Sequence, residues 1–113
     1  QYTYKQGLLH GPSTSYFENG SVASETQFSL GKEQGIRYEF FPNGYFKSIT
    51  QFVEGKESGD FFEFYESGVI KTEGYFKNGL QHGMWWDFYE SGLLMTETYF
   101  EEGKEQGAWV EYY

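Results

Sequence analysis

Glycine recurs in this chain at a fixed interval of 24 residues. Fourteen of the 15 glycines fall into three series with that spacing, and only Gly74 lies outside them. Random placement would put about two glycines in those columns, so the period is strong evidence for tandem repeats. The series are Gly7, Gly31, Gly55, Gly79 and Gly103; Gly11, Gly35, Gly59, Gly83 and Gly107; and Gly20, Gly44, Gly68 and Gly92.

Each 24-residue unit has the pattern of a β-hairpin. In the clearest copy, residues 84–89 (MWWDFY) and 93–100 are candidate strands separated by residues 90–92 (ESG). A three-residue loop that ends in glycine is a common hairpin connection, with the glycine in the left-handed conformation. The link between hairpins carries Asn78-Gly79, the pair preferred in two-residue hairpin turns. Strands joined by such short turns must be antiparallel neighbours.

The sequence therefore predicts an all-β fold, a single-layer antiparallel meander of tandem 24-residue hairpins. We expect it to be elongated and twisted, with about ten strands and an advance of roughly 10 Å per repeat. One repeat domain should cover residues 1–113. Its expected units are a partial repeat at 1–6, full repeats at 7–30, 31–54, 55–78 and 79–102, and a partial repeat at 103–113.

The three-residue loop also predicts which residues face each other. Phe88 should pair with Leu94, and Asp87 with Met95. Equivalents of the second pair carry opposite charges, namely Glu39 with Lys47 and Glu63 with Lys71. With this register, Phe88, Leu94 and Phe100 line the more apolar face, while Asp87 lies on the other.

Composition and charge exclude several kinds of partner. Aromatic residues make up 23% of the chain, and such large apolar side chains supply a core that argues against disorder. The formal charge is −9, from 17 acidic and 8 basic residues, which argues against nucleic acid and anionic membranes as ligands. The chain has no cysteine, no apolar run long enough for a membrane helix and no recognisable signal peptide. Membrane insertion is not expected, and the sequence does not indicate the cellular compartment.

No pattern of residues indicates catalysis, a metal site or a cofactor. The carboxylates Glu39, Glu63, Asp87 and Glu111 form one column of the repeat. Column neighbours should lie near 10 Å apart, slightly beyond the roughly 5–9.5 Å of paired glycosidase carboxylates. His10 and His82 also share a column, but 72 residues of sequence place them about 30 Å apart, too far to share a metal. We therefore expect a protein that is not an enzyme.

Aromatic residues beside carboxylates are the best candidates for binding. Exposed aromatic rings next to acidic groups would suit a basic or amphipathic protein surface. Because the later repeats carry more of them, binding is predicted to centre on residues 61–109. The candidate partner-binding residues are Phe61, Tyr65, Trp85, Asp87, Tyr89 and Trp109.

The phrases WWDFYESGLLMTETYFEEGKEQG and FFEFYESGVIKTEGYFKNGLQHG resemble the MORN repeat in its bacterial variant form. The resemblance runs through nearly all of residues 7–113. It implies a single-layer antiparallel sheet that serves protein–protein contact, and bacterial chains of this variant are often labelled as antitoxins. The unit differs from the common eukaryotic pattern, which runs Tyr-x-Gly-x-Trp at about 23 residues.

Two functions of different classes follow. The first is a protein-interaction or scaffold module, including an antitoxin or immunity-type inhibitor in a bacterium. The alternative is binding of a carbohydrate or a cell-surface ligand such as choline, because aromatic rings stack on sugars and enclose quaternary ammonium groups. Self-association through open sheet edges is a further expectation.

Overall fold

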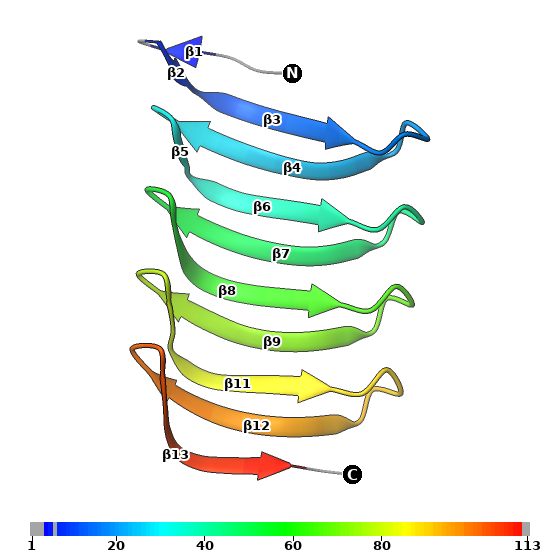
Figure 1. Ribbon diagram of the computed structural model, residues 1–113, viewed down its shortest axis with the longest axis vertical. Coiled ribbons are helices and arrows are strands. Elements are labelled where there is room, and N and C mark those ends of the chain that lie inside the picture. Colours follow the sequence, from blue (N-terminus) through cyan, green and yellow to red (C-terminus); the bar gives the residue numbers. More distant parts are fainter. Residues whose placement is uncertain (1–3, 6, 112–113) are drawn as a thin grey trace.

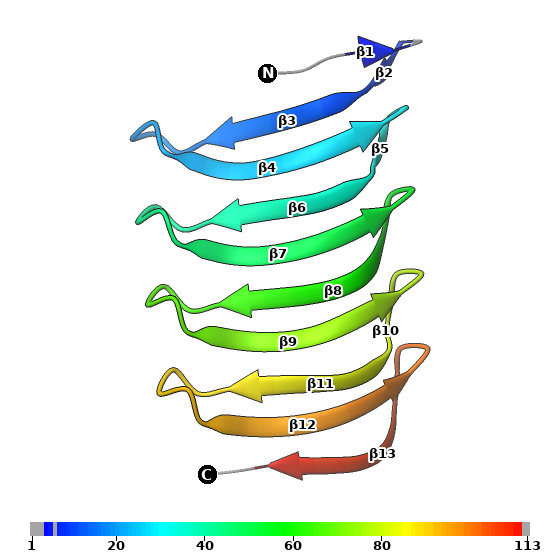
Figure 2. The same cartoon turned by 180° about the vertical axis from the view of Figure 1, so that it is seen from behind.

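The computed structural model describes residues 4–5 and 7–111, and the side chains of residues 7–104. The chain forms an open antiparallel sheet of hairpins that follow one another along the sequence (Figures 1 and 2). Its Cα atoms extend over 49 × 34 × 13 Å. The strands of the main sheet are hydrogen-bonded to one another in one continuous order, so they form one layer. The predicted all-β, single-layer meander is confirmed.

The main sheet has the strand order β13-β12-β11-β9-β8-β7-β6-β4-β3, with β10 added beside β9 and β5 beside β4. Strands β1 and β2 form a separate pair. The strands are β1 Tyr4–Lys5, β2 Leu8–Leu9, β3 Gly11–Tyr16, β4 Val22–Ser29, β5 Lys32–Glu33, β6 Gly35–Phe40, β7 Phe46–Val53, β8 Lys56–Phe64, β9 Ile70–Lys77, β10 Leu80–Gln81, β11 Gly83–Phe88, β12 Leu94–Glu101 and β13 Lys104–Glu111.

The three-residue loops are followed by a β-bulge that the sequence did not reveal. The loop glycine is left-handed as predicted; at Gly92 its φ is +94°. Phe88 faces Leu94 as predicted, but Asp87 then faces Thr96, because one extra residue is inserted in β12. The same shift occurs in the equivalent hairpins, so the predicted charge pairs were wrong. Glu39 lies opposite Ser48 and Glu63 opposite Thr72, instead of Lys47 and Lys71.

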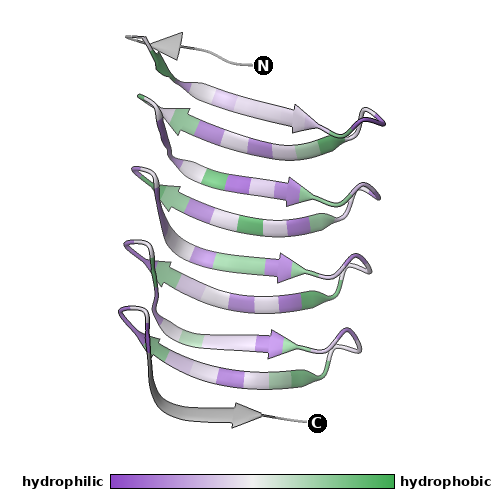
Figure 3. Ribbon diagram, viewed as in Figure 1, coloured by the Kyte–Doolittle hydropathy of each residue, from purple (hydrophilic) through white to green (hydrophobic). Residues whose placement is uncertain are grey.

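The bulge also changes which residues share a face. Side chains alternate between the two faces of a strand, so a one-residue shift moves every later residue to the opposite face. Phe88 and Leu94 lie together, but Phe100 lies opposite Gly83, on the face of Trp85 and Asp87. The predicted grouping of Phe100 with Phe88 was therefore wrong. Figure 3 shows strongly hydrophilic residues separated by paler or hydrophobic ones along β4, β7 and β9.

Two-residue turns join the hairpins, as the Asn78-Gly79 pair predicted. Both central residues of each turn have positive φ, the type I′ pattern; at Asn78 and Gly79 the angles are +51° and +84°. Each turn glycine also donates its N–H to a carbonyl of the preceding repeat, as Gly79 does to Glu57 at 2.7 Å. The turns therefore connect successive repeats. The first turn position is instead Leu30, Glu54 and Glu102 in the other three turns.

Glu54→Asn is expected to stabilise the fold by about 0.5–1 kcal/mol, because asparagine tolerates the left-handed conformation better than other residues with a Cβ atom. Glu54 has φ of +50°, and its N–H bonds to Gln34, a contact that the substitution leaves in place. The reverse change, Asn78→Glu, should destabilise by a similar amount. Urea unfolding of both variants checks this, and an unchanged midpoint in both would contradict it.

A second glycine series forms a corner on the turn side of each repeat. Gly35, Gly59 and Gly83 have φ of +97°, +117° and +75°, values that disfavour residues with a Cβ atom. At the corner, His82 donates its backbone N–H to the Tyr75 carbonyl at 2.9 Å. Figures 1 and 2 show the chain bending sharply here, between the turns and the long strands.

Candidate binding face

Two of the predicted binding residues, Phe61 and Trp85, belong to an aromatic core on one face of the sheet. Their rings stack with centroids 5.6 Å apart. Phe76 packs edge-on against both, at 5.4 Å from Phe61 and 5.0 Å from Trp85, and Phe100 lies 6.2 Å from Trp85. Trp85 is only 5% exposed. The expectation of an exposed ring at Trp85 was therefore wrong, and we name this side of the sheet the packed face.

Gly74, the glycine outside the three series, makes room for this core. It lies opposite Phe61 on β8. A Cβ atom at Gly74 would come 2.2 Å from the Trp85 ring, far inside van der Waals contact. The Trp85 indole also donates to the Tyr75 carbonyl at 3.1 Å. The absence of a side chain at Gly74 therefore allows the indole to lie against the strand.

Asp87, another predicted binding residue, holds strands together on the packed face. Its two carboxylate oxygens accept hydrogen bonds from Thr72 at 2.9 Å and Thr96 at 2.8 Å. Glu39 likewise accepts from Ser48 at 2.6 Å. Two carboxylates of the column, Glu39 and Asp87, are thus paired with hydroxyl groups, which supports the structural role expected for them, although the partners are not lysines.

The remaining predicted residues lie near the loops or outside the described side chains. Tyr65 is half-buried and donates its hydroxyl to the Phe88 carbonyl at 2.7 Å, which links two repeats. Tyr89 is half-buried, and its N–H closes the three-residue loop on Leu93 at 2.8 Å. Trp109 lies in β13 opposite Thr98, but its side chain is outside the described residues. The six predicted residues therefore do not form one exposed strip.

The opposite side of the sheet, which we name the open face, carries a row of alternating aromatic and acidic side chains. Cross-strand pairing places Glu73 between Phe62 and Trp86, and Glu97 opposite Trp86. The Trp86 indole donates to Glu97 at 2.9 Å, which fixes the ring. Sequence reasoning missed this row because it omitted the bulge; the alternation of MWWDFY itself separates Trp86 from Trp85.

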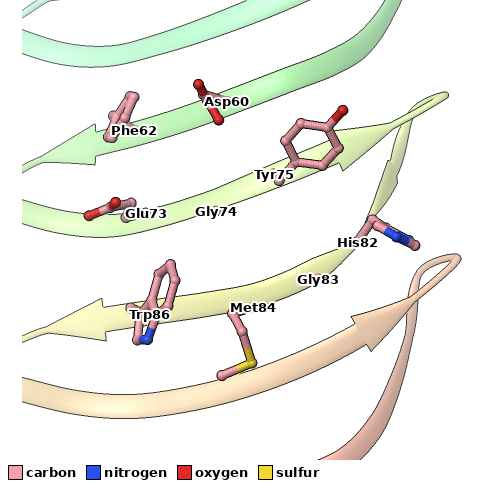
Figure 4. Close-up of a pocket in the computed structure, with 9 residues that line it drawn as sticks. All are labelled: Asp60, Phe62, Glu73, Gly74, Tyr75, His82, Gly83, Met84 and Trp86. Atoms are coloured by element: carbon pink, nitrogen blue, oxygen red, sulfur yellow. The ribbon is translucent and has the colours of Figure 1, made fainter.

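A cavity of about 260 Å³ opens on the open face beside Trp86 (Figure 4). Phe62, Glu73 and Trp86 line it with Asp60 and Tyr75, from strands β8, β9 and β11. His82 lies at its turn end, where the buried Nδ1 finds no hydrogen-bond partner within the described part of the chain. The lining residues come from two successive repeats, 55–78 and 79–102, and the polar groups named here are side chains.

A cluster of three phenylalanine rings lies beside a second hollow on the open face. Phe46 stacks on Phe40 at 5.1 Å and lies 6.2 Å from Phe64. Phe46 and Phe64 also line a shallow space of about 490 Å³ with Tyr45 and Val69. Phe46 is 40% exposed and Tyr45 is 54% exposed. The open face thus presents large apolar groups to solvent over two successive repeats.

An arginine on the packed face shows how this chain holds a cation. The Arg37 guanidinium makes two hydrogen bonds to Glu33, at 2.8 and 3.0 Å, and lies 4.5 Å from the centroid of the Phe52 ring. The hydrogen bonds to Glu33 raise the pKa of Arg37 above its ordinary value, although burial opposes them. Carboxylate and ring together accommodate the planar cation.

Comparison with known protein families identifies the repeat. The model of the MORN repeat variant matches residues 9–29 and 57–78. Two of the repeats are therefore MORN repeats of this variant. The predicted resemblance is confirmed for these two repeats, and the 24-residue period continues through the units between and after them. No curated protein matches the chain.

MORN repeats are generally found in protein-interaction or membrane-binding modules. Within the described residues, no group of three or more histidine, cysteine, aspartate or glutamate side chains could hold a metal ion. Over the same part of the chain, no helix is long and apolar enough to cross a membrane. The candidate binding site is the open face, where aromatic and acidic side chains lie in register on neighbouring strands.

Proposed function

We propose that this MORN array is a protein-interaction module, without catalytic activity, that binds a basic surface of a partner through its open face. The observation that carries the proposal is the row in which Glu73 lies between Phe62 and Trp86, followed by Glu97. Aromatic anchors next to carboxylates combine apolar contact with electrostatic steering of a positive partner. The formal charge of −9 also favours a positively charged partner and argues against binding to an anionic membrane.

Inhibition is the specific form of this function that we favour. An acidic face that covers the basic surface of a toxin would act as an antitoxin or immunity-type protein, the role that the resemblance to bacterial MORN variants implies. Such a complex requires a stable, preformed surface. The Trp86 indole bonded to Glu97 and the stacked Phe40 and Phe46 rings meet that requirement, because fixed side chains lose less entropy on binding.

Selection from a random peptide library on the immobilised chain tests the proposal. Enriched peptides should carry arginine or lysine, and their affinity should fall as salt rises. They should lose about tenfold or more in affinity on a Phe62→Ser/Trp86→Ser variant, since buried aromatic anchors contribute about 2 kcal/mol or more each.

Leu93→Ser supplies the matched control, because Leu93 is 69% exposed at a hairpin loop and does not line the cavity beside Trp86. This variant should bind the peptides as the parent does. Peptides that bind the double variant unchanged would overturn the choice of face. Enrichment of no peptide, together with binding on a glycan array, would instead support the carbohydrate alternative.

A further inference from the structure

The cavity beside Trp86 has the size and lining of a site for one side chain. Its volume of about 260 Å³ lies below the roughly 300–1,000 Å³ of sites for drug-sized ligands. Phe62 and Trp86 supply aromatic walls on either side of Glu73, and Asp60 adds a second carboxylate (Figure 4). The cavity is therefore too small for an extended ligand, but it suits a single protruding group.

The two carboxylates in the cavity favour a cationic ligand. Within the described side chains, no hydrogen bond or ion pair engages the carboxylates of Asp60 and Glu73, in contrast to Asp87 and Glu39. Two unpaired carboxylates repel phosphate and other anions, whereas aromatic rings attract cations. Trp86 is fixed by its bond to Glu97, so one ring of the site is already oriented.

Arginine fits this combination better than lysine. Its planar guanidinium stacks on aromatic rings and presents a fork of N–H donors to a carboxylate, while the lysine ammonium is a compact, strongly hydrated charge. The chain already binds one arginine in this manner, because Arg37 bonds to Glu33 and lies over Phe52. The open-face cavity presents the same two kinds of group, a ring and a carboxylate.

We infer that this cavity is a socket for an arginine side chain of the partner protein. The guanidinium would lie against Trp86 and donate to Glu73, with Asp60 as the second acidic group. The inference rests on the proposed function and deepens it, since it names the residue type that the partner must present and the two repeats that receive it.

Titration with the blocked tripeptide acetyl-Gly-Arg-Gly-amide tests the socket, with the Trp86 indole N–H signal followed by NMR. We expect a saturable shift of that signal. The lysine analogue should bind more weakly, and the uncharged citrulline analogue should give no saturable shift. Glu73→Gln should weaken arginine binding by about tenfold, because a hydrogen bond to a charged group contributes about 1.5–3 kcal/mol.

Glu25→Gln is the matched control. Glu25 occupies the same column of the repeat as Glu73 and faces Tyr38, but it lies outside the cavity. Its variant should bind the arginine peptide as the parent does. Equal binding of the citrulline and arginine peptides, or an unchanged affinity in Glu73→Gln, would overturn the socket. Library peptides that still need Phe62 and Trp86 in that case would leave the protein-binding proposal standing.

Discussion

Gly74→Thr is expected to lower the free energy of unfolding by about 3 kcal/mol, the upper range for overpacking a well-packed core. A Cβ atom at this position would come 2.2 Å from the ring of Trp85. The ring cannot move away freely, because it stacks on Phe61 and its indole is bonded to Tyr75. Gly74 has no unusual backbone angle, so steric conflict alone should account for the effect. Urea unfolding followed by circular dichroism measures it.

Threonine itself is compatible with this column of the repeat. Thr50 and Thr98 occupy the equivalent positions and are 3% and 7% exposed. A double-mutant cycle with Trp85→Ser therefore isolates the conflict. The cost of Gly74→Thr should largely disappear in the Trp85→Ser background, which gives a favourable coupling between the two changes. Strictly additive effects would show that the ring and the glycine are independent.

Trp85→Ala is expected to cost about 3–5 kcal/mol of stability, as for other buried aromatic residues. Its ring contacts Phe61, Phe76 and Phe100 and is 5% exposed. Trp86→Ala should cost about 1–2 kcal/mol, because the neighbouring ring lies half-buried on the open face and loses chiefly its bond to Glu97.

Binding of the arginine peptide should depend more on Trp86 than on Trp85. Trp86→Ala should abolish the peptide-induced shift of the Met84 methyl signal, while a folded Trp85→Ala protein should retain the open-face cavity. The Met84 methyl signal reports on the cavity in both variants. Equal losses of stability at Trp85 and Trp86 would contradict the assignment of the two rings to different faces.

The repeat unit, its hairpins and both turn types could be predicted from the sequence, because local chemistry determines them. Glycine at Gly92 and the Asn78-Gly79 pair require specific backbone angles, and the structure has those angles. The bulge in β12 could not be predicted from residue type in this way. It inserts one ordinary residue, Met95, whose equivalents are alanine and lysine, so no residue type marks the position.

The prediction of the candidate site was wrong because it did not include the bulge. Without the bulge, Phe100 was placed on the face of Phe88, and Trp85 was expected to be exposed next to Asp87. The structure places Phe100 against Trp85 and leaves Trp86 on the open face. One signal in the sequence pointed to the correct packing, because Gly74 departs from the threonines of its column where two large rings must meet.

The row across the open face gives the array a fixed unit of length. Equivalent positions in successive repeats are two strands apart, about 10 Å, which is close to one turn of a polyproline II segment, with three residues per turn and a rise of about 3.1 Å per residue. A partner segment lying across the strands in that conformation would therefore meet one row position with every third residue. Because the column that holds Glu73 reads Glu25, Ile49, Glu73 and Glu97 along the chain, such a segment would be matched by the order of its charged and apolar residues.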